Sequence, residues 1–202
     1  MSDAEGVVIE ADGPVLRIVI DRPSRKGSLD PLTPVGGFES LPVGDRIGGV
    51  DDVDRLRAQG TVLTAALLLG VSDAALTVAR DYSLEREQFG QPIGTFQALK
   101  HMMADMFVRT SLARSATYAA AAVLDDPAVG HVARSVSAAK LLAGEAGIDN
   151  ARAAVQVLGG MGFTWEMLPN HLLKRAWALE STFGSASAHA TSISASVASE
   201  IR

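Results

Sequence analysis

Residues 86–97 read REQFGQPIGTFQ, and they decide the fold because they close one helical pattern and open the next. Gly90 and Pro92 are residues typical of turns, so the chain is expected to reverse direction here. A second segment, QVLGGMGFT at residues 156–164, has three glycines within four residues and ends another helical pattern. The two segments stand in order, with the length of a helical hairpin between them.

Helical patterns flank both segments. Apolar residues recur at helical spacing from Val53 to Tyr82, and Asp51 and Asp52 suit the N-cap and the positive end of the helix dipole. Thr95 is expected to cap the next helix. We expect helices at about residues 53–82, 95–124, 131–157, 164–179 and 185–201. Long antiparallel helices joined by short turns predict a mainly α fold, an up-down antiparallel helical bundle.

The chain before Gly48-Gly49 has a different composition. Val15–Ile20 is rich in β-branched residues, and residues 7–10 look like a partner strand, so residues 7–20 are expected to form a hairpin. The prolines and glycines of residues 22–49 imply loops or extended segments. We therefore predict two parts, a short β-strand and loop segment at residues 1–48 and a helical bundle at residues 49–202.

Composition limits the partners and the chemistry. A net charge of −5 and a pI near 5.3 argue against a nucleic-acid partner. The chain has no cysteine, which excludes disulfides and thiolate metal sites, and its four histidines lack metal-ligand spacing, so no metal is expected. The N-terminus does not read as a signal peptide, and the apolar run at residues 61–71 is short for a membrane span. We expect a soluble cytoplasmic protein without a membrane partner.

Taken together, the two segments resemble the signatures R-x-Q-F-G-x-P-I-x-x-F-Q and Q-x-x-G-G-x-G of the acyl-CoA dehydrogenase family. The resemblance covers about residues 49–184 and includes residues 79–82, 100–106 and 140–145. It implies an FAD enzyme that removes the α and β hydrogens of a fatty acyl or sterol side-chain CoA thioester. In that family a Glu carboxylate takes the α-proton and FAD accepts the β-hydride.

The resemblance also implies which residues contact the flavin, which lies across a dimer interface in the family. An arginine presents a planar fork suited to phosphate, and glycine lets a ligand approach the backbone. Either segment alone is read more simply, as a helix end with a solvated arginine or as a helix stop. The family places two sets of contacts here: Arg86, Gln88 and Phe89 toward the FAD of the neighbouring subunit, and Gln156, Gly159 and Gly160 toward its adenosine-pyrophosphate part.

The usual catalytic base is missing. Alignment on Gly184 puts Phe183 at its position, and phenylalanine cannot accept a proton. Glu180 lies nearly one helical turn earlier and is a weaker candidate, with a solvated or ion-paired helix residue as its ordinary reading. Some family members carry the base on the first helix of this domain, which places Asp54 at that position. The ordinary reading of Asp54 is a favourable charge at a helix N-terminus.

Only about fifty residues precede the bundle, where complete family members carry two further domains. Residues 1–30 weakly resemble the start of an enoyl-CoA hydratase (crotonase) chain, and a remnant of a β-domain gives the same strand pattern. The run Gly162–Glu166 resembles actinobacterial members that handle sterol side chains, some of which form mixed tetramers. We expect a truncated or helper subunit that contributes half of an FAD site, in a homo-oligomer or with a larger acyl-CoA dehydrogenase subunit. The alternatives are a non-catalytic helical interaction module or fusion remnant without flavin and, third, a standalone dehydrogenase that uses Asp54.

Overall fold

The computed structural model describes residues 6–12, 15–21 and 50–200, and the chain divides into two compact units, Met1–Asp52 and Val53–Arg202. In the first unit, β1 (Gly6–Asp12) pairs antiparallel with β2 (Val15–Asp21), with Val7 opposite Ile20. The hairpin expected from the β-branched runs is confirmed. The loops expected at residues 22–49 lie outside the described residues.

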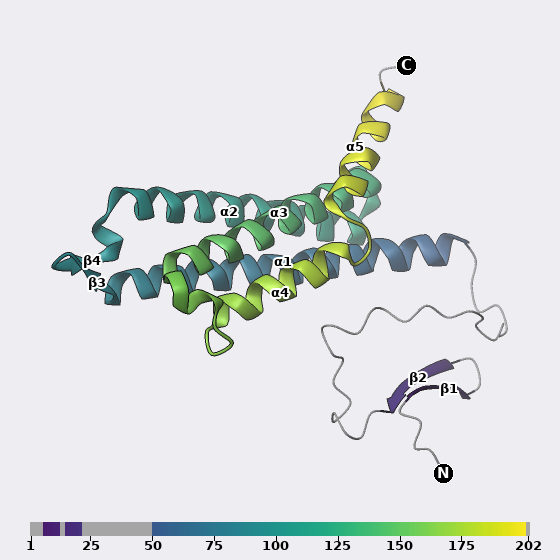
Figure 1. The fold of residues 1–202 in the computed structure, drawn as a ribbon. Coiled ribbons are helices and arrows are strands. Elements are labelled where there is room, and N and C mark those ends of the chain that lie inside the picture. Colours follow the sequence, from purple (N-terminus) through teal and green to yellow (C-terminus); the bar gives the residue numbers. More distant parts are fainter. Residues whose placement is uncertain (1–5, 13–14, 22–49, 201–202) are drawn as a thin grey trace, which may run out of the picture. The chain divides into compact units, whose positions relative to one another are not determined.

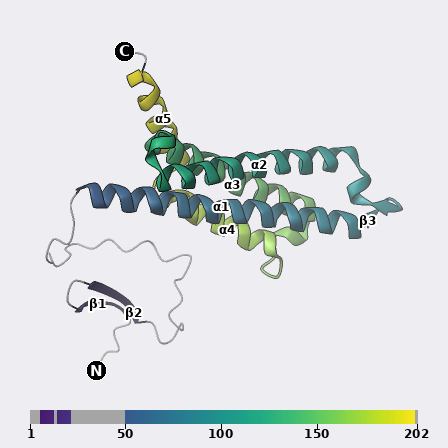
Figure 2. The ribbon, with the colours of Figure 1, turned by 180° about the vertical axis from the view of Figure 1, so that it is seen from behind.

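The second unit is a bundle of helices, as the periodicity predicts. Short 3-10 turns, η2 to η4, join its helices or extend their ends (Figure 1). Figures 1 and 2 show α1, α2 and α3 running alongside one another, with α4 against them and α5 leaving the bundle at an angle. The elements are α1 (Val50–Glu85), η2 (Ile93–Thr95), α2 (Gln97–Asp125), η3 (Pro127–Val129), α3 (Val132–Leu158), η4 (Gly159–Phe163), α4 (Leu168–Ser181) and α5 (Ala186–Glu200).

Two expected helix caps are wrong. The helix α1 begins at Val50, so Asp51 and Asp52 lie inside its first turn and not before it. Thr95 belongs to η2, and its hydroxyl donates to the carbonyl of Pro92 at 2.7 Å. The helix α2 therefore starts after Phe96, because the 3-10 turn uses the hydroxyl that the sequence suggested as a cap.

Small residues let the helices approach closely. Glycine 147 of α3 faces α1, and a Cβ atom there would lie 3.1 Å from the Cδ2 atom of Leu68. Close packing of this kind gains dispersion energy from many short contacts. Alanines make up much of the fully buried apolar core of the second unit: Ala65, Ala75, Ala79, Ala113, Ala120, Ala139, Ala143, Ala151, Ala154 and Ala176.

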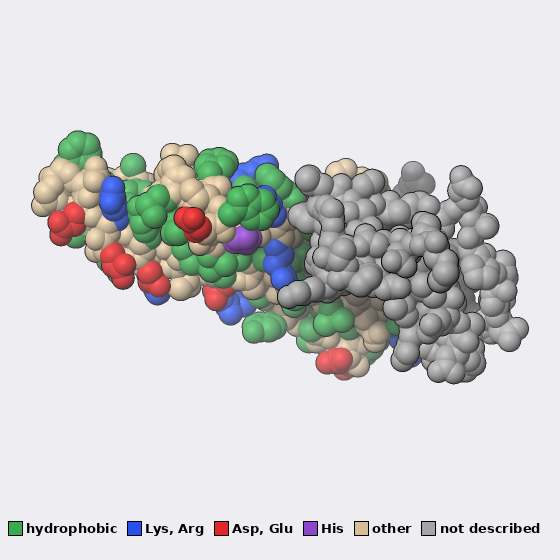
Figure 3. Space-filling view, turned by 60° about the horizontal axis from the view of Figure 1, so that its bottom comes forward, with side chains coloured by type: hydrophobic (Ala, Val, Ile, Leu, Met, Phe, Trp, Pro, Cys, Tyr) green, Lys and Arg blue, Asp and Glu red, His purple; other side chains and the backbone are tan. Residues whose placement is uncertain are grey.

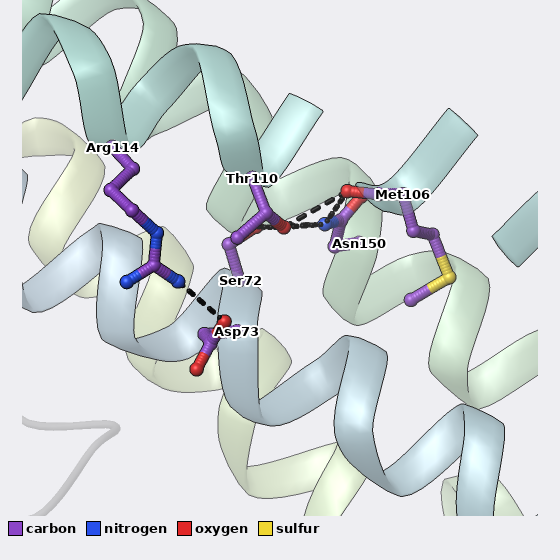
Figure 4. Close-up of polar contacts among 6 residues, drawn as sticks. All are labelled: Ser72, Asp73, Met106, Thr110, Arg114 and Asn150. Atoms are coloured by element: carbon purple, nitrogen blue, oxygen red, sulfur yellow. Dashed lines mark hydrogen bonds and ion pairs between the residues drawn. The ribbon is translucent and has the colours of Figure 1, made fainter. Parts of the chain in front are cut away.

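A buried amide ties the three long helices together (Figure 4). The Asn150 Nδ2 atom donates to Ser72 Oγ at 2.7 Å, to Thr110 Oγ1 at 2.9 Å and to the Met106 carbonyl at 2.9 Å. Its Oδ1 atom accepts from Arg109 Nη1 at 2.7 Å. In the described part of the chain, every buried polar side-chain atom has a hydrogen-bond partner. The network thus fixes the register of α1, α2 and α3 without leaving unsatisfied groups.

The helix α1 is long and apolar enough, from Val53 to Glu85, to cross a membrane by length and composition. The apolar run is thus longer than the segment at residues 61–71 suggested. Half of its most apolar window is buried inside the protein. Leu56, Leu63 and Leu84 of the same helix are exposed, so packing in the bundle accounts for only part of its apolar character.

Candidate functional site

A cavity of about 620 Å³ lies where the end of α1 meets the end of α3. Both sequence segments contribute to it, although they are far apart along the chain. The structure brings together Arg86, Gln88, Gly159 and Gly160 of the predicted contacts, while Phe89 and Gln156 do not line the cavity. We call it the α1-end cavity, and its lining is Tyr82, Arg86, Gln88, Ile93, Val157, Leu158, Gly159, Gly160 and Met161.

The backbone around Arg86 is held on both sides. Its N–H donates to the Tyr82 carbonyl at 2.9 Å, and its carbonyl accepts from the Ile93 N–H at 2.8 Å. The next residues form a small antiparallel ladder, with β3 (Glu87–Gln88) against β4 (Gln91–Pro92). The guanidinium is thus carried on a fixed turn at the cavity edge.

The tip of that turn presents an aromatic ring to the outside. Phe89 has a φ of 55° and Gly90 a φ of 78°, so two successive residues lie in the left-handed region. Only glycine adopts this region without steric cost. The Phe89 side chain is 93% exposed and meets Phe96 edge to face, with ring centroids 6.1 Å apart. A strained and exposed aromatic residue is a feature that packing within this chain does not explain.

The α1-end cavity holds a cation without a counter-ion. Among the described residues, no side chain forms an ion pair or hydrogen bond with the Arg86 guanidinium, and Arg86 carries the charge of the lining. The Gln88 Nε2 atom donates to the carbonyl of Glu87 at 2.7 Å. An unpaired guanidinium beside an open cavity is suited to an anionic ligand such as a phosphate.

The three glycines of the second segment have different explanations. A Cβ atom at Gly162 would lie 2.6 Å from the Val155 carbonyl oxygen, so packing demands glycine there. Gly159 has a φ of 62°, so its conformation demands glycine. Gly160 has neither reason, since a Cβ atom there would meet nothing within 4 Å. Its bare backbone faces open space at the cavity, where a ligand can approach the main chain.

A second cavity, of about 460 Å³, lies between α1, α3 and α5. It brings together Asp54 and Phe183, the two positions to which the family resemblance assigns alternative bases. In the described part of the chain, the Asp54 carboxylate has no hydrogen-bond or ion-pair partner. We call it the Asp54 cavity, and its lining is Asp54, Arg57, Ala58, Thr61, Val132, Ala133, Val136, Ser137, Phe183, Gly184, Ala188, His189 and Ser192.

Glu180, the weaker candidate base, does not line this cavity. Its Oε1 atom accepts from the N–H of Ala186, the first residue of α5, at 2.8 Å. A carboxylate in that place satisfies a free helix N–H and faces the positive end of the helix dipole. The arrangement favours the structural reading of Glu180.

The Phe183 ring forms part of the cavity wall. The residue has a φ of 57°, again in the left-handed region. Its ring rests on Gly60 of α1, where a Cβ atom would lie 2.3 Å from the ring Cζ atom. Glycine at position 60 is therefore what allows the ring to reach this helix.

Lys140 on α3 is a buried cation beside the Asp54 cavity to which the sequence assigned no role. It is 1% exposed, and its Nζ atom donates to the carbonyls of Glu180 and Gly184 at 2.7 and 2.9 Å. Burial lowers the pKa of Lys140, and the charge of Glu180 opposes that shift. The available sequence signal is a single charge within the small apolar run around residues 138–144.

His189 on α5 lines the Asp54 cavity, and the sequence assigned it no role beyond the absence of metal-ligand spacing. Its Nε2 atom lies 3.1 Å from the Phe183 carbonyl and its Nδ1 atom 3.2 Å from Ser137 Oγ. Because a carbonyl only accepts, Nε2 carries the hydrogen in this arrangement. Burial lowers the pKa of His189, the Phe183 carbonyl raises it, Lys140 lowers it and Glu180 raises it, in decreasing order of effect. The imidazole is therefore favoured in its neutral form.

Comparison with known proteins shows the family of the helical part of the chain. The family model described as "Acyl-CoA dehydrogenase, C-terminal domain" matches residues 49–198. The chain is 40% identical over 123 residues to the acyl-CoA dehydrogenase IpdE2 of Mycolicibacterium smegmatis, covering 58% of this chain and 37% of that protein. It is 39% identical over 128 residues to the acyl-CoA dehydrogenase FadE34 of Mycobacterium tuberculosis, covering 61% of this chain and 17% of that one.

A solved structure of the ChsE4-ChsE5 complex from Mycobacterium tuberculosis shares the fold. The TM-score is 0.71 at 30% sequence identity, over 76% of this chain and 41% of that one. The chain thus spans less than half the length of each of these three similar proteins.

Proposed function

The chain belongs to the acyl-CoA dehydrogenase family through its C-terminal domain, and from that premise we propose that it supplies part of an FAD site. The proposed reaction is the α,β-dehydrogenation of an acyl-CoA or sterol side-chain CoA thioester, in which bound FAD accepts the hydride. The observation that carries the proposal is the α1-end cavity, where Arg86 and the bare backbone of Gly160 meet. In our proposal the chain is a helper subunit that completes the site with another subunit.

The donors of the α1-end cavity fit the anionic part of a dinucleotide. In our proposal Arg86 pairs with the pyrophosphate, and the main chain at Gly159 and Gly160 approaches the same group. Gln88 adds a neutral polar contact. Phe89 stands outside the cavity, so its exposed ring suits a flat group held mainly by the neighbouring subunit. Gln156, just before the lining residues of α3, remains a proposed contact.

The second cavity supplies the proposed proton acceptor. Asp54 lies at the start of α1 and Arg86 just after its end, about 48 Å apart at a rise of 1.5 Å per residue. A single flavin is too short to contact both, so the two cavities serve different flavin sites in an assembly. Asp54 takes the α-proton in this proposal, because Phe183 cannot.

The exposed apolar surface fits a role in an assembly. Several large apolar side chains on α1 and α2 are more than half exposed, and Figure 3 shows apolar side chains scattered among charged ones on one face. We propose a homo-oligomer or a hetero-oligomer with a larger acyl-CoA dehydrogenase subunit. The cytoplasm is the proposed location, since a chain without cysteine suits a reducing compartment.

The first experiment is a visible absorbance spectrum of the purified protein, from 350 to 500 nm, with and without FAD. Flavin bands that bleach on addition of an acyl-CoA would support a working site, and bands that persist would support a helper subunit. No bands, alone or with a co-expressed larger subunit, would favour a helical interaction module without flavin.

The site assignment is tested by Arg86→Ala. Loss of a charge-assisted contact to phosphate is expected to weaken FAD binding about tenfold or more, without unfolding the bundle. Arg175→Ala is the matched control, since Arg175 is also exposed and lies outside both cavities. Equal flavin occupancy in the two variants would refute the role of Arg86.

A further inference from the structure

We propose that Lys140 and His189 are positioning residues of the Asp54 cavity. Together they hold the turn from Glu180 to Gly184 so that the side chain of residue 183 faces Asp54. The inference rests on the function proposed for this cavity, in which residue 183 stands where the family carries its base. It adds two groups from α3 and α5 that act through the backbone of the turn.

The first step concerns the free carbonyls of the turn. The last carbonyls of a helix have no partner within that helix. After α4 the chain takes a left-handed conformation at Phe183 and Gly184, with φ values of 57° and 104°. The carbonyls of Glu180 and Gly184 accept from Lys140, and the carbonyl of Phe183 accepts from His189. Two side chains therefore satisfy three carbonyls of one reversal.

The second step concerns the free-energy cost of burying the Lys140 ammonium group. A buried ammonium is expensive unless a carboxylate or several acceptors compensate for the lost water. The carboxylate of Glu180 binds the N–H of Ala186, and the described contacts of the Lys140 Nζ atom are the two carbonyls. The chain thus places a costly cation where its hydrogen bonds fix the conformation of this turn.

The third step is that, within the turn, Lys140 and His189 bind only main-chain carbonyls. The side chain at position 183 takes no part in these hydrogen bonds, and Gly60 leaves room for that side chain against α1. Its identity can therefore change while its placement stays the same. A proton-accepting side chain at position 183 would be delivered to the cavity that already contains Asp54.

The test is amide hydrogen exchange of the flavin-free protein, corrected for intrinsic rates. Lys140→Met removes the donors but keeps the length of the side chain, and we expect at least tenfold faster exchange at the amides of residues 182–186. His189→Ala is expected to do the same to a smaller extent. His189→Gln is expected to restore slow exchange, because its amide can donate to the Phe183 carbonyl. The amides of α2 should not change in any of these variants.

Gly60→Ala is the control, since it displaces the Phe183 ring without touching Lys140 or His189. It should leave exchange at residues 182–186 as in the wild type. Wild-type exchange rates in both Lys140→Met and His189→Ala would overturn the proposal. If Lys140→Met does not fold, the contrast between His189→Ala and His189→Gln decides, and equal rates in those two variants overturn it.

The pH dependence reports the burial of the His189 ring. Lys140 on α3, Glu180 on α4, and Asp54 and Arg57 on α1 are the charged groups around His189. Burial lowers the pKa of His189, so its neutral form contributes stability that is complete above about pH 6.5 and is lost as the pH falls below that value. Protonation leaves the Nε2–H donor to the Phe183 carbonyl in place and removes the Nδ1 acceptor that faces Ser137, so quicker exchange at residues 182–186 on acidification, expected in the wild type and not in His189→Gln, reports the burial of the charged ring. The contrast between His189→Ala and His189→Gln decides the role of His189, whatever the flavin experiment shows.

Discussion

Each end of α1 carries a charged side chain without a partner in the described part of the chain, but the two ends differ in how the neighbouring turn is held. At the α1-end cavity, Arg86 has no partner among the described residues, and Gly160 has no packing reason to be glycine. At the Asp54 cavity the Asp54 carboxylate is likewise without a partner among the described residues, but the carbonyls of the turn are partnered and the space over Gly60 is filled by the Phe183 ring. Unpartnered groups point to a missing ligand, whereas satisfied groups point to a fixed frame.

The largest expected effect comes from the buried hydrogen-bond network of Asn150, which lies between the two cavities and holds α1, α2 and α3 together. Asn150→Ala removes four hydrogen bonds among α1, α2 and α3 and leaves a cavity, so we expect a loss of about 3 kcal/mol in the free energy of unfolding. Urea unfolding followed by circular dichroism measures it. Ser72→Ala removes fewer bonds of the same network and should cost about 1 kcal/mol. A loss below 1 kcal/mol in Asn150→Ala would show that the network does not hold the bundle together.

A second pair of variants separates packing from ligand access within one segment. Gly162→Ala forces a methyl group against the Val155 backbone and should cost about 2 kcal/mol of stability. Gly160→Ala adds its methyl group to open space, so stability should stay within about 0.5 kcal/mol. Thermal unfolding measures both, and FAD titration should show weaker binding in Gly160→Ala. Full flavin binding by Gly160→Ala would remove Gly160 from the proposed site.

The helices were predictable because their signals are local. Apolar spacing and the glycine clusters place every long helix of the bundle within a few residues of its ends. The predicted caps failed at Asp51, Asp52 and Thr95, because helix ends depend on where the neighbouring turn closes. Periodicity alone cannot assign such ends.

The candidate site was predictable only where a motif marks it. The family signatures identify Arg86 and Gly160, and the structure adds that they share one cavity. No motif assigns a role to Asn150, Lys140 or His189, although Lys140 lies in a segment covered by the family resemblance; their partners lie on other helices or in the turn after α4. Asn150 and Lys140 contact residues about forty or more positions away, and His189 contacts Ser137 on α3 as well as Phe183, six positions before it. Contacts between distant segments are not encoded in any local pattern of a single sequence.

The smallest expected effect lies on the surface between the two ends. Arg114 Nη2 contacts Asp73 Oδ1 at 2.8 Å across the α1–α2 groove, with both side chains about half exposed (Figure 4). Asp73→Asn should change stability by about 0.5 kcal/mol or less, and added salt should abolish the difference. The same urea titration at low and high ionic strength measures it. A larger, salt-independent loss would mean that this pair belongs to the buried network.

The length of α1 also shapes how this chain can evolve. Substitutions at sites that share no contacts usually act additively, so changes at one end of a helix of 36 residues leave the other end nearly untouched. A lineage can therefore lose the proton acceptor at position 183 while selection still maintains Arg86 and the glycines, because a neighbouring subunit uses them. One molecule can in this way lose its own catalytic step and still be retained because another molecule depends on it.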